Sequence, residues 1–204
     1  VAKLISSGAD RKEALKNLAD GLEATCIEGV QTNLEYLRQI VASSMFESCD
    51  YTTKSLDSFQ FVASSLEVLE PGALTTVQDY PGRIGYWSIG VPPGGPMDSY
   101  SFRLANRLVG NSSDAAGLEC TLQGPSLKFH CDTVVAVTGG VVPVTIDDEP
   151  APQNQAVAIR AGQVLTIGLV EHGQRMYIAV QGGIQVPVVI GSRATFELGK
   201  LGGF

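Results

Sequence analysis

Residues 133–180 read TVVAVTGGVVPVTIDDEPAPQNQAVAIRAGQVLTIGLVEHGQRMYIAV and decide the fold of the longer part of this chain. The segment is rich in β-branched residues, which pack well on a pleated sheet. Turn sequences interrupt it at Asp147-Asp148-Glu149-Pro150 and at Ala161-Gly162. Short strands between such turns indicate a barrel or a sandwich rather than alternating βαβ units. The predicted strands are Leu66–Leu69, Thr133–Val137, Val141–Ile146, Gln155–Arg160, Val164–Leu169 and Met176–Val180.

One helix is predicted to interrupt these strands. Asp98 is a favourable N-cap residue, and Gly110-Asn111 is a favourable helix end. The apolar residues between them recur at helical spacing. They are Phe102, Ala105, Leu108 and Val109.

The first 58 residues have a helical pattern instead. Asp10 and Glu13 fit a capping box, which predicts a helix over 11–24. Short strands are expected at Val1–Ile5 and Thr25–Ile27. Leu34, Leu37, Ile40 and Val41 form the apolar stripe of a second helix.

The two patterns together predict an α+β chain. Residues 1–58 form helices with short strands, 59–65 a partly packed linker, and 66–204 a mainly β domain with one inserted helix. Because the chain begins at Val1 rather than Met, we expect it to be cut from a longer protein.

Composition narrows the function. The chain has 204 residues, 44% of them apolar, and a net charge of −7. The acidic balance argues against nucleic acid as a partner, because phosphate binding needs a basic face. A membrane span needs about 20 uninterrupted apolar residues, and no stretch reaches that length. Four scattered cysteines and two histidines give no metal-binding spacing, and unpatterned thiols suit a reducing, cytoplasmic location.

The segment from Pro81 to Pro96 is unusually rich in glycine and proline. Such a long shaped loop carries function more often than scaffold does. Gly94 and Gly95 lie just before the helix at Asp98, where their bare N–H groups would form an oxyanion cradle. A plain hairpin loop with a tight corner is the alternative.

Charged residues beside this loop have two interpretations each. Asp98 caps the helix, and a second carboxylate oxygen would be free to face a pocket. Arg83 would orient a carboxylate or a carboxylated cofactor, or else pair with Asp79 at the surface.

Four polar residues are candidate substrate ligands. Asn106 is a ligand contact or a buried amide that fixes a loop. Thr138 and Gln181 precede Gly-Gly pairs, which are most simply turns, and they would line one mouth of a barrel. Gln78 is the fourth. Motifs for nucleotide phosphates are absent from the sequence.

Several stretches resemble a known family. ALTTVQDYPGRIGYW (73–87), VPPGGPMDSYSFRLANRLVGN (91–111), GLECTLQGPSLKF (117–129) and YIAVQGGIQVPVVIGSRAT (177–195) resemble the carboxyltransferase region of urea carboxylases and urea amidolyases. Allophanate hydrolase subunit 2 and one component of the bacterial 5-oxoprolinases are related to that region. AKLISSGADRKEALKNL and IEGVQTNLEYLRQI resemble the end of a biotin carboxylase C-terminal domain, and this order favours urea carboxylase.

The resemblance implies a function in two steps. Biotin on a carrier domain is carboxylated with ATP and Mg²⁺, and the carboxyltransferase then moves the carboxyl group from carboxybiotin to urea, which gives allophanate. The ATP site, the biotinylated carrier domain and the rest of the multidomain enzyme are expected outside residues 1–204, so the chain alone should be inactive. The resemblance also implies a cyclophilin-like barrel. Alternatives are a 5-oxoprolinase-like component of an ATP-dependent lactam hydrolase, or an inactive truncated module.

Site roles follow from the chemistry that the resemblance implies. Urea offers four N–H donors and one carbonyl, so its pocket needs acceptors such as Asp98 or Asn106 and one donor. Negative charge that grows on the biotin ureido oxygen needs fixed donors, for which the Gly94 and Gly95 amides and Arg83 are candidates. We therefore expect a water-excluded positioning site without a catalytic triad. Gly94 stands where relatives commonly carry Ser.

Overall fold

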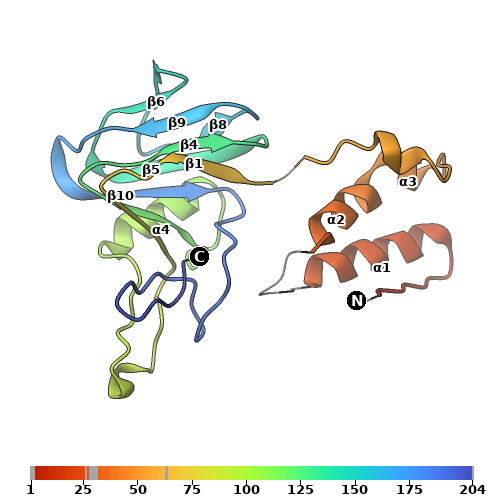
Figure 1. Cartoon of the computed structure of the whole chain (residues 1–204), viewed down its shortest axis with the longest axis horizontal. Helices are drawn as coiled ribbons and strands as arrows, with labels where there is room; N and C mark the ends of the chain where they lie inside the picture. Colours follow the sequence, from red (N-terminus) through yellow and green to blue (C-terminus); the bar gives the residue numbers. More distant parts are fainter. Residues whose placement is uncertain (1–2, 26, 28–31, 63, 204) are drawn as a thin grey trace. The chain divides into compact units, whose positions relative to one another are not determined.

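The computed structural model describes residues 3–25, 27, 32–62 and 64–203. It divides into two compact units, Val1–Ala63 and Ser64–Phe204, which are described separately (Figure 1). No helix in the described part of the chain is both long and apolar enough to cross a bilayer.

The first unit is helical. Asp10 caps α1 by accepting a hydrogen bond from Glu13 N (2.8 Å), and Glu13 reaches back to Ala9 N (2.6 Å). The described residues of the expected strands Val1–Ile5 and Thr25–Ile27 lie in no strand, while Val1, Ala2 and Cys26 fall outside the described residues. The helices are α1 (Arg11–Ala24), α2 (Leu34–Ala42), α3 (Ser44–Glu47) and the 3₁₀ turn η1 (Ser55–Ser58).

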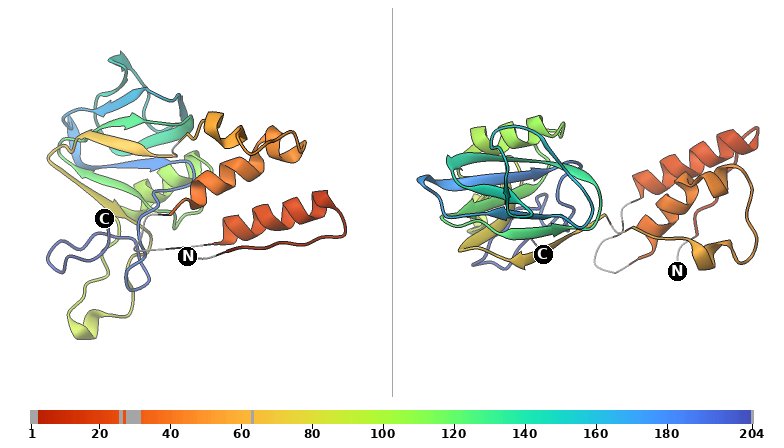
Figure 2. Two further views of the ribbon diagram at one scale, coloured as in Figure 1. Left: turned by 45° about the vertical axis from the view of Figure 1, so that its right-hand side comes forward. Right: turned by 90° about the horizontal axis from the view of Figure 1, so that it is seen from above.

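The second unit consists of two antiparallel five-stranded sheets (Figures 1 and 2). Sheet A has the order β1-β4-β9-β6-β7, and sheet B has the order β2-β3-β10-β5-β8. In the described residues, strand pairing stays within each sheet, so the ladders do not close a barrel. The strands are β1 (Leu66–Glu70), β2 (Leu74–Gln78), β3 (Gly117–Thr121), β4 (Ser126–Phe129), β5 (Thr133–Val141), β6 (Val144–Ile146), β7 (Glu149–Pro150), β8 (Val157–Ile159), β9 (Val164–Ile167) and β10 (His172–Val180).

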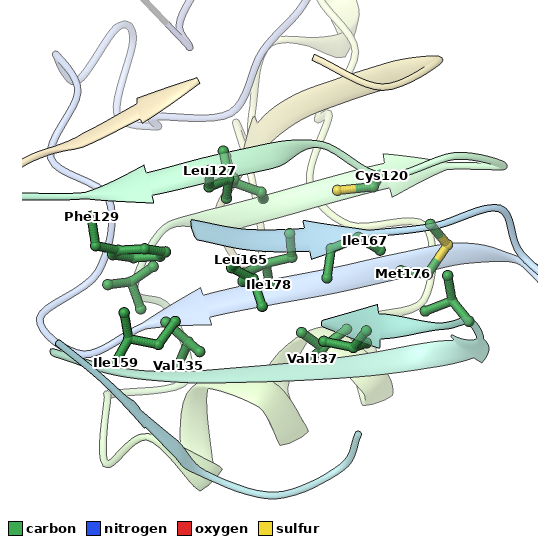
Figure 3. Packing of buried hydrophobic residues seen from close by; sticks show 14 of the residues in the cluster. Cys120, Leu127, Phe129, Val135, Val137, Ile159, Leu165, Ile167, Met176 and Ile178 are labelled. Atoms are coloured by element: carbon green, nitrogen blue, oxygen red, sulfur yellow. The ribbon is translucent and has the colours of Figure 1, made fainter. Parts of the chain in front are cut away.

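The main core lies between the two sheets (Figure 3). Successive side chains of a strand point to opposite faces, so alternate residues of each strand reach this core. Leu127 and Leu165 come from sheet A and Ile178 from sheet B, and each is at most 1% exposed. Burial also raises the pKa of the Cys120 thiol to about 12.

Helix α4 (Ser99–Leu108) covers the other face of sheet B. Phe102 meets the ring of Tyr177 edge-on, with the ring centroids 6.0 Å apart. Ala105 and Val109 are buried in the same cluster, with Leu108 packed against it. The predicted apolar stripe of this helix is confirmed.

The prediction of a helical segment followed by a mainly β domain with one inserted helix is confirmed. Two details differ. The expected turn at Gly139-Gly140 lies inside β5, where Gly139 pairs with Met176 next to an irregularity in the ladder. The edge strand β2 and its neighbour β3, which were not predicted, complete sheet B and carry much of the candidate site.

Candidate functional site

A long loop joins β2 to α4 and folds back on itself at Gly94 and Gly95. Both glycines have positive φ, +65° and +81°. A Cβ on Gly95 would lie 2.9 Å from Pro81 O, and one on buried Gly82 would lie 2.5 Å from Pro93 O. Backbone therefore packs directly on backbone here, and glycine is required for the close approach.

Among residues 64–203, the amides of this corner have no hydrogen-bond acceptor. Within residues 64–203, neither Gly94 N–H nor Gly95 N–H donates a hydrogen bond. Gly94 is exposed and Gly95 is half-buried. The corner therefore offers two unused backbone donors at the surface.

Arg83 lies under this corner and is 1% exposed. Its backbone N donates to Pro93 O (2.5 Å), Nε donates to Val189 O (2.9 Å) and Nη2 donates to Ala194 O (2.6 Å). Its Nη1 has no partner among the described residues. Arg83 thus ties three backbone segments together, and one of its guanidinium nitrogens is buried without a partner among the described residues.

The expected surface pair between Arg83 and Asp79 is wrong. Asp79 instead accepts hydrogen bonds from Ser192 Oγ (2.6 Å) and Arg193 N (2.7 Å). Both carboxylate oxygens of Asp79 are hydrogen-bonded to a segment more than 100 residues later in the chain. These partners could not be inferred from the sequence, because they lie so far along the chain.

Asp98 is the N-cap of α4, and its side chain is exposed. Oδ1 accepts from Tyr100 N (3.0 Å) and Ser101 N (3.1 Å), and Oδ2 accepts from Ser101 Oγ (2.5 Å). The hydrogen bond from the Ser101 hydroxyl, with those from the Ser101 and Tyr100 amides, lowers the pKa of Asp98 below its ordinary value. Contrary to expectation, neither oxygen is left free to face a water-excluded pocket, because both hold the first turn of the helix.

A buried polar row on sheet B supports the start of α4. Glu119 pairs across the sheet with Tyr177, which in turn pairs with Thr138. Glu119 Oε2 accepts from Met97 N (2.7 Å), and Tyr177 OH accepts from Asp98 N (2.7 Å). Thr138 Oγ1 donates to Ser101 O (2.8 Å). The row therefore fixes the backbone on both sides of the helix start.

Burial and the charge of Glu119 both raise the pKa of Tyr177 in this row. Arg175 Nη1 donates to Glu119 Oε1 (2.8 Å), and the Glu119 side chain is 7% exposed. Burial raises the pKa of Tyr177, and the nearby Glu119 carboxylate adds to that shift, so the hydroxyl stays protonated. Its oxygen accepts from Asp98 N while its proton stays in place.

The other candidate ligands are divided between two regions. Gln78 ends β2 near the corner, is 6% exposed and donates to Thr76 Oγ1 (3.0 Å). Asn106 lies about 12 Å along α4 from Asp98. Its amide donates to Ala115 O and accepts from Asn111 Nδ2, so it has the contacts of a buried amide that fixes a loop.

Gln181 lies beyond the end of β10, four residues and about 13 Å along the strand direction from Tyr177. It is exposed and lines a separate pocket of about 430 Å³ with Cys131 and Thr133. The structure thus places Arg83, Gly94 and Gly95 together at the corner, and Asp98 and Thr138 together at the start of α4. Gln78 lies on the edge strand β2, separated by two strands from the strand that carries Thr138, while Asn106 lies farther along α4 and Gln181 lies beyond the end of β10.

Sequence reasoning missed Glu119, Tyr177 and Thr195. Glu119 stands between Leu118 and Cys120 in a strand-like run. Because successive side chains of a strand point to opposite faces, its carboxylate had to lie on the face opposite the core, and this was the available signal. Thr195 gave no local signal, because its position depends on a long-range hydrogen bond to Val77 O (2.8 Å).

Two family models match the chain. The model described as carboxyltransferase domain, subdomain A and B, matches residues 89–204. The model described as biotin carboxylase C-terminal domain matches residues 1–58.

Curated relatives and solved structures agree with these matches. A urea amidolyase of Lachancea kluyveri is 48% identical over 204 residues, which are 100% of this chain and 11% of that protein. The crystal structure of the Kluyveromyces lactis urea carboxylase superposes with a TM-score of 0.78 at 52% identity, over 97% of this chain and 18% of that one. A component of the 5-oxoprolinase of Escherichia coli is 40% identical over 130 residues, 64% of this chain and 42% of that protein. The chain thus spans about a tenth of the length of its full-length urea amidolyase relative.

Proposed function

Because this chain belongs to the carboxyltransferase family defined by subdomains A and B, we propose that it is part of a biotin-dependent urea carboxylase. In this proposal, residues 66–204 are the first part of the carboxyltransferase domain, which moves a carboxyl group from biotin to urea and gives allophanate. The 48% sequence identity to a urea amidolyase, which extends over the whole chain, supports urea as the substrate.

The first unit is assigned to another part of the longer enzyme, the biotin carboxylase. Residues 1–58 are proposed to end a biotin carboxylase C-terminal domain, and 59–65 to link it to the carboxyltransferase. ATP and Mg²⁺ would be used by that biotin carboxylase, and biotin would arrive on a carrier domain of the longer enzyme. Cys49, Cys120 and Cys131 are free thiols, which suits a cytoplasmic enzyme.

The observation that carries the proposed site is the set of unused donors at the glycine corner. Gly94 N–H, Gly95 N–H and the buried Arg83 Nη1 have no partner among the described residues. Fixed donors of this kind stabilise negative charge that develops on an oxygen, and they cost no reorganisation during the reaction. The residues therefore fit the ureido oxygen of biotin, on which charge grows when the carboxyl group leaves.

Each part of the site has a separate task. Biotin, held at its ureido oxygen by Arg83 and the glycine amides, would supply the transferable carboxyl group and a basic ureido group for proton transfer. Arg83 and the glycine amides hold oxygen atoms in place, and Gln78 Oε1 supplies a buried acceptor for an N–H group. Asp98 and Thr138 act indirectly, because they fix the first turn of α4 beside the corner.

A component of an ATP-dependent lactam hydrolase is the second candidate, because the Escherichia coli 5-oxoprolinase component matches 64% of this chain. Its match covers 130 residues, whereas the urea amidolyase match covers all 204 and so includes residues 1–58, which match the biotin carboxylase C-terminal domain. Biotin-dependent turnover of urea, but not of 5-oxoproline, would decide for the first candidate.

The test separates the two half-reactions in the full-length enzyme. Gly95→Ala places a methyl group 2.9 Å from Pro81 O and should displace the corner. Gly90→Ala is the matched control, since Gly90 also has a positive φ (+83°) but its added Cβ meets nothing within 4 Å.

We expect Gly95→Ala to lower carboxyl transfer to urea at least about tenfold, the effect of losing about 1.4 kcal/mol of transition-state stabilisation. ATP-dependent biotin carboxylation should remain at the level of the Gly90→Ala control. Equal loss of both half-reactions, or unchanged transfer, would refute the assignment of this corner.

A further inference from the structure

Helix α4 presents a second stripe of side chains beside the apolar one that packs on sheet B. Tyr100, Arg103, Leu104 and Arg107 are three or four residues apart, so they follow one another along one side of the helix. Tyr100 and both arginines are exposed, and Leu104 is half-buried. The stripe lines a pocket of about 340 Å³, which we call the arginine pocket. Its lining residues are Tyr100, Arg103, Leu104, Arg107, Asn111 and Ser113.

The two arginines of this pocket lack a carboxylate partner. In the described part of the chain, neither the Arg103 nor the Arg107 guanidinium forms an ion pair or a hydrogen bond, whereas Arg38 and Arg175 are both paired with glutamates. Like charges four residues apart on a helix repel one another. An anion held between the two guanidinium groups would remove that repulsion.

Arg103 is also held in place before any ligand binds. Its Cζ lies 5.1 Å from the centroid of the Tyr80 ring, a cation–π contact. Tyr80 packs against the cluster beneath α4, so the ring is a supported platform. A guanidinium that is already positioned loses less conformational entropy when it binds a ligand. The chain as a whole has a net charge of −7, so this pocket is a local exception with a positive potential.

We propose that the arginine pocket binds a small, doubly charged oxyanion, a phosphate group or a dicarboxylate, between Arg103 and Arg107. The planar fork of a guanidinium matches the oxygens of carboxylates and phosphates. Tyr100 and Ser113, which also line the pocket, carry hydroxyl groups that donate to such oxygens. A volume of about 340 Å³ suits a small molecule.

This site goes beyond the proposed carboxyl transfer and shares no residue with the glycine corner. One chemistry, two negative charges carried by oxygen atoms, has two sources here. A phosphate group concentrates both charges on one centre, and a dicarboxylate separates them. The two sources are distinguished by using one compact and one extended dianion as probes.

The experiment is isothermal titration calorimetry of the full chain with inorganic phosphate, with succinate and with acetate. Inorganic phosphate is mostly doubly charged at about pH 8, and the ionic strength is held constant with NaCl because salt screens exposed charges. The test variants are Arg103→Gln and Arg107→Gln, since glutamine has nearly the helix propensity of arginine.

Arg160→Gln is the matched control. It removes the same charge from an exposed position of the same unit, and Arg160 does not line the arginine pocket. Its guanidinium likewise forms no ion pair with any residue that the structure describes. Thermal unfolding of the three variants confirms that they are folded.

We expect phosphate or succinate to saturate the chain with a Kd below about 1 mM. Arg103→Gln and Arg107→Gln should each weaken this binding at least about tenfold, the effect of losing a charge-assisted hydrogen bond, and Arg160→Gln should stay within about twofold of the original chain. Saturation by phosphate alone means that one compact anion bridges both arginines. Saturation by succinate alone means that each arginine holds its own carboxylate.

Three results would overturn the inference. They are the absence of saturation by both dianions, equally tight binding of singly charged acetate, and binding to Arg103→Gln and Arg107→Gln that matches the Arg160→Gln control. Because the titrations involve no turnover, each of these results leaves the carboxyl-transfer proposal to its own test.

Discussion

Arg83 and Asp98 show how differently two charged side chains are used within one loop. Arg83 is buried and donates to the carbonyls of Val189 and Ala194, while its third nitrogen stays without a partner among the described residues. Asp98 is exposed, and both of its carboxylate oxygens bind the first turn of α4. Both side chains therefore shape the backbone, and among their polar atoms Arg83 Nη1 is the one buried without a partner among the described residues.

At this scale the lowered pKa of Asp98 predicts a pH dependence of stability. A carboxyl whose folded-state pKa lies below its ordinary 3.8 stabilises the fold fully above that value, and the contribution is lost as the pH falls through the folded-state pKa. Asp98→Asn keeps an N-cap side chain but cannot ionise. We expect the difference in unfolding free energy between the chain and this variant to be largest at pH 6–7 and to shrink below about pH 4.

Thermal unfolding followed by circular dichroism between pH 2.5 and 7 measures that difference. Glu70→Gln, at an exposed position of β1, serves as the charge-matched control. A difference that stays constant across this range would show that the ionised carboxylate contributes nothing specific to the cap.

At the scale of elements, β3 links the two faces of sheet B. Leu118 and Cys120 enter the core between the sheets, while Glu119 between them faces the loop and accepts from Met97 N. The neighbouring strand β10 supplies Tyr177, which packs on Phe102 and accepts from Asp98 N. The strands thus set the position of the helix start, and the helix start sets that of the corner.

Tyr177→Phe is expected to destabilise the second unit by about 1–2 kcal/mol, because it leaves the half-buried Asp98 N–H without its acceptor. Tyr100→Phe is the matched control, since Tyr100 is 75% exposed. Chemical unfolding measures both. Equal stability of the two variants would mean that water replaces the hydroxyl at no cost.

At the scale of the whole molecule, how much the sequence predicts depends on the range of the interactions. Apolar periodicity predicted α1 and α4, and β-branched runs between turn residues predicted most strands, because those patterns are local. Strands β2, β3, β4 and β7 were not predicted. Burial of Arg83 was not predictable, since its partners lie 106 and 111 residues away. The same holds for Asp79, whose surface pair with Arg83 was expected from proximity in sequence and which instead bonds Ser192 and Arg193.

The two units should also differ in stability. Among the described residues of the first unit, Leu22 and Ile40 are the buried apolar side chains, whereas the second unit has an extensive core between its sheets. Local opening is easier where few apolar contacts are buried. We expect amide hydrogens of α1 and α2 to exchange at least tenfold faster than those of β5 and β10, measured by mass spectrometry. Similar protection in both units would contradict this.

The hydrogen bonds that join Asp79 and Arg83 to residues 192–194 have a consequence for synthesis on the ribosome. Chains emerge from their N-terminal end, so Asp79 and Arg83 leave the exit tunnel long before Ser192 and Ala194 exist. Until then the Arg83 guanidinium lacks the carbonyls of Val189 and Ala194, to which it donates in the folded chain. The glycine corner likewise lacks the segment that packs against it. The buried position of Arg83 can therefore form only after about 110 further residues have been translated.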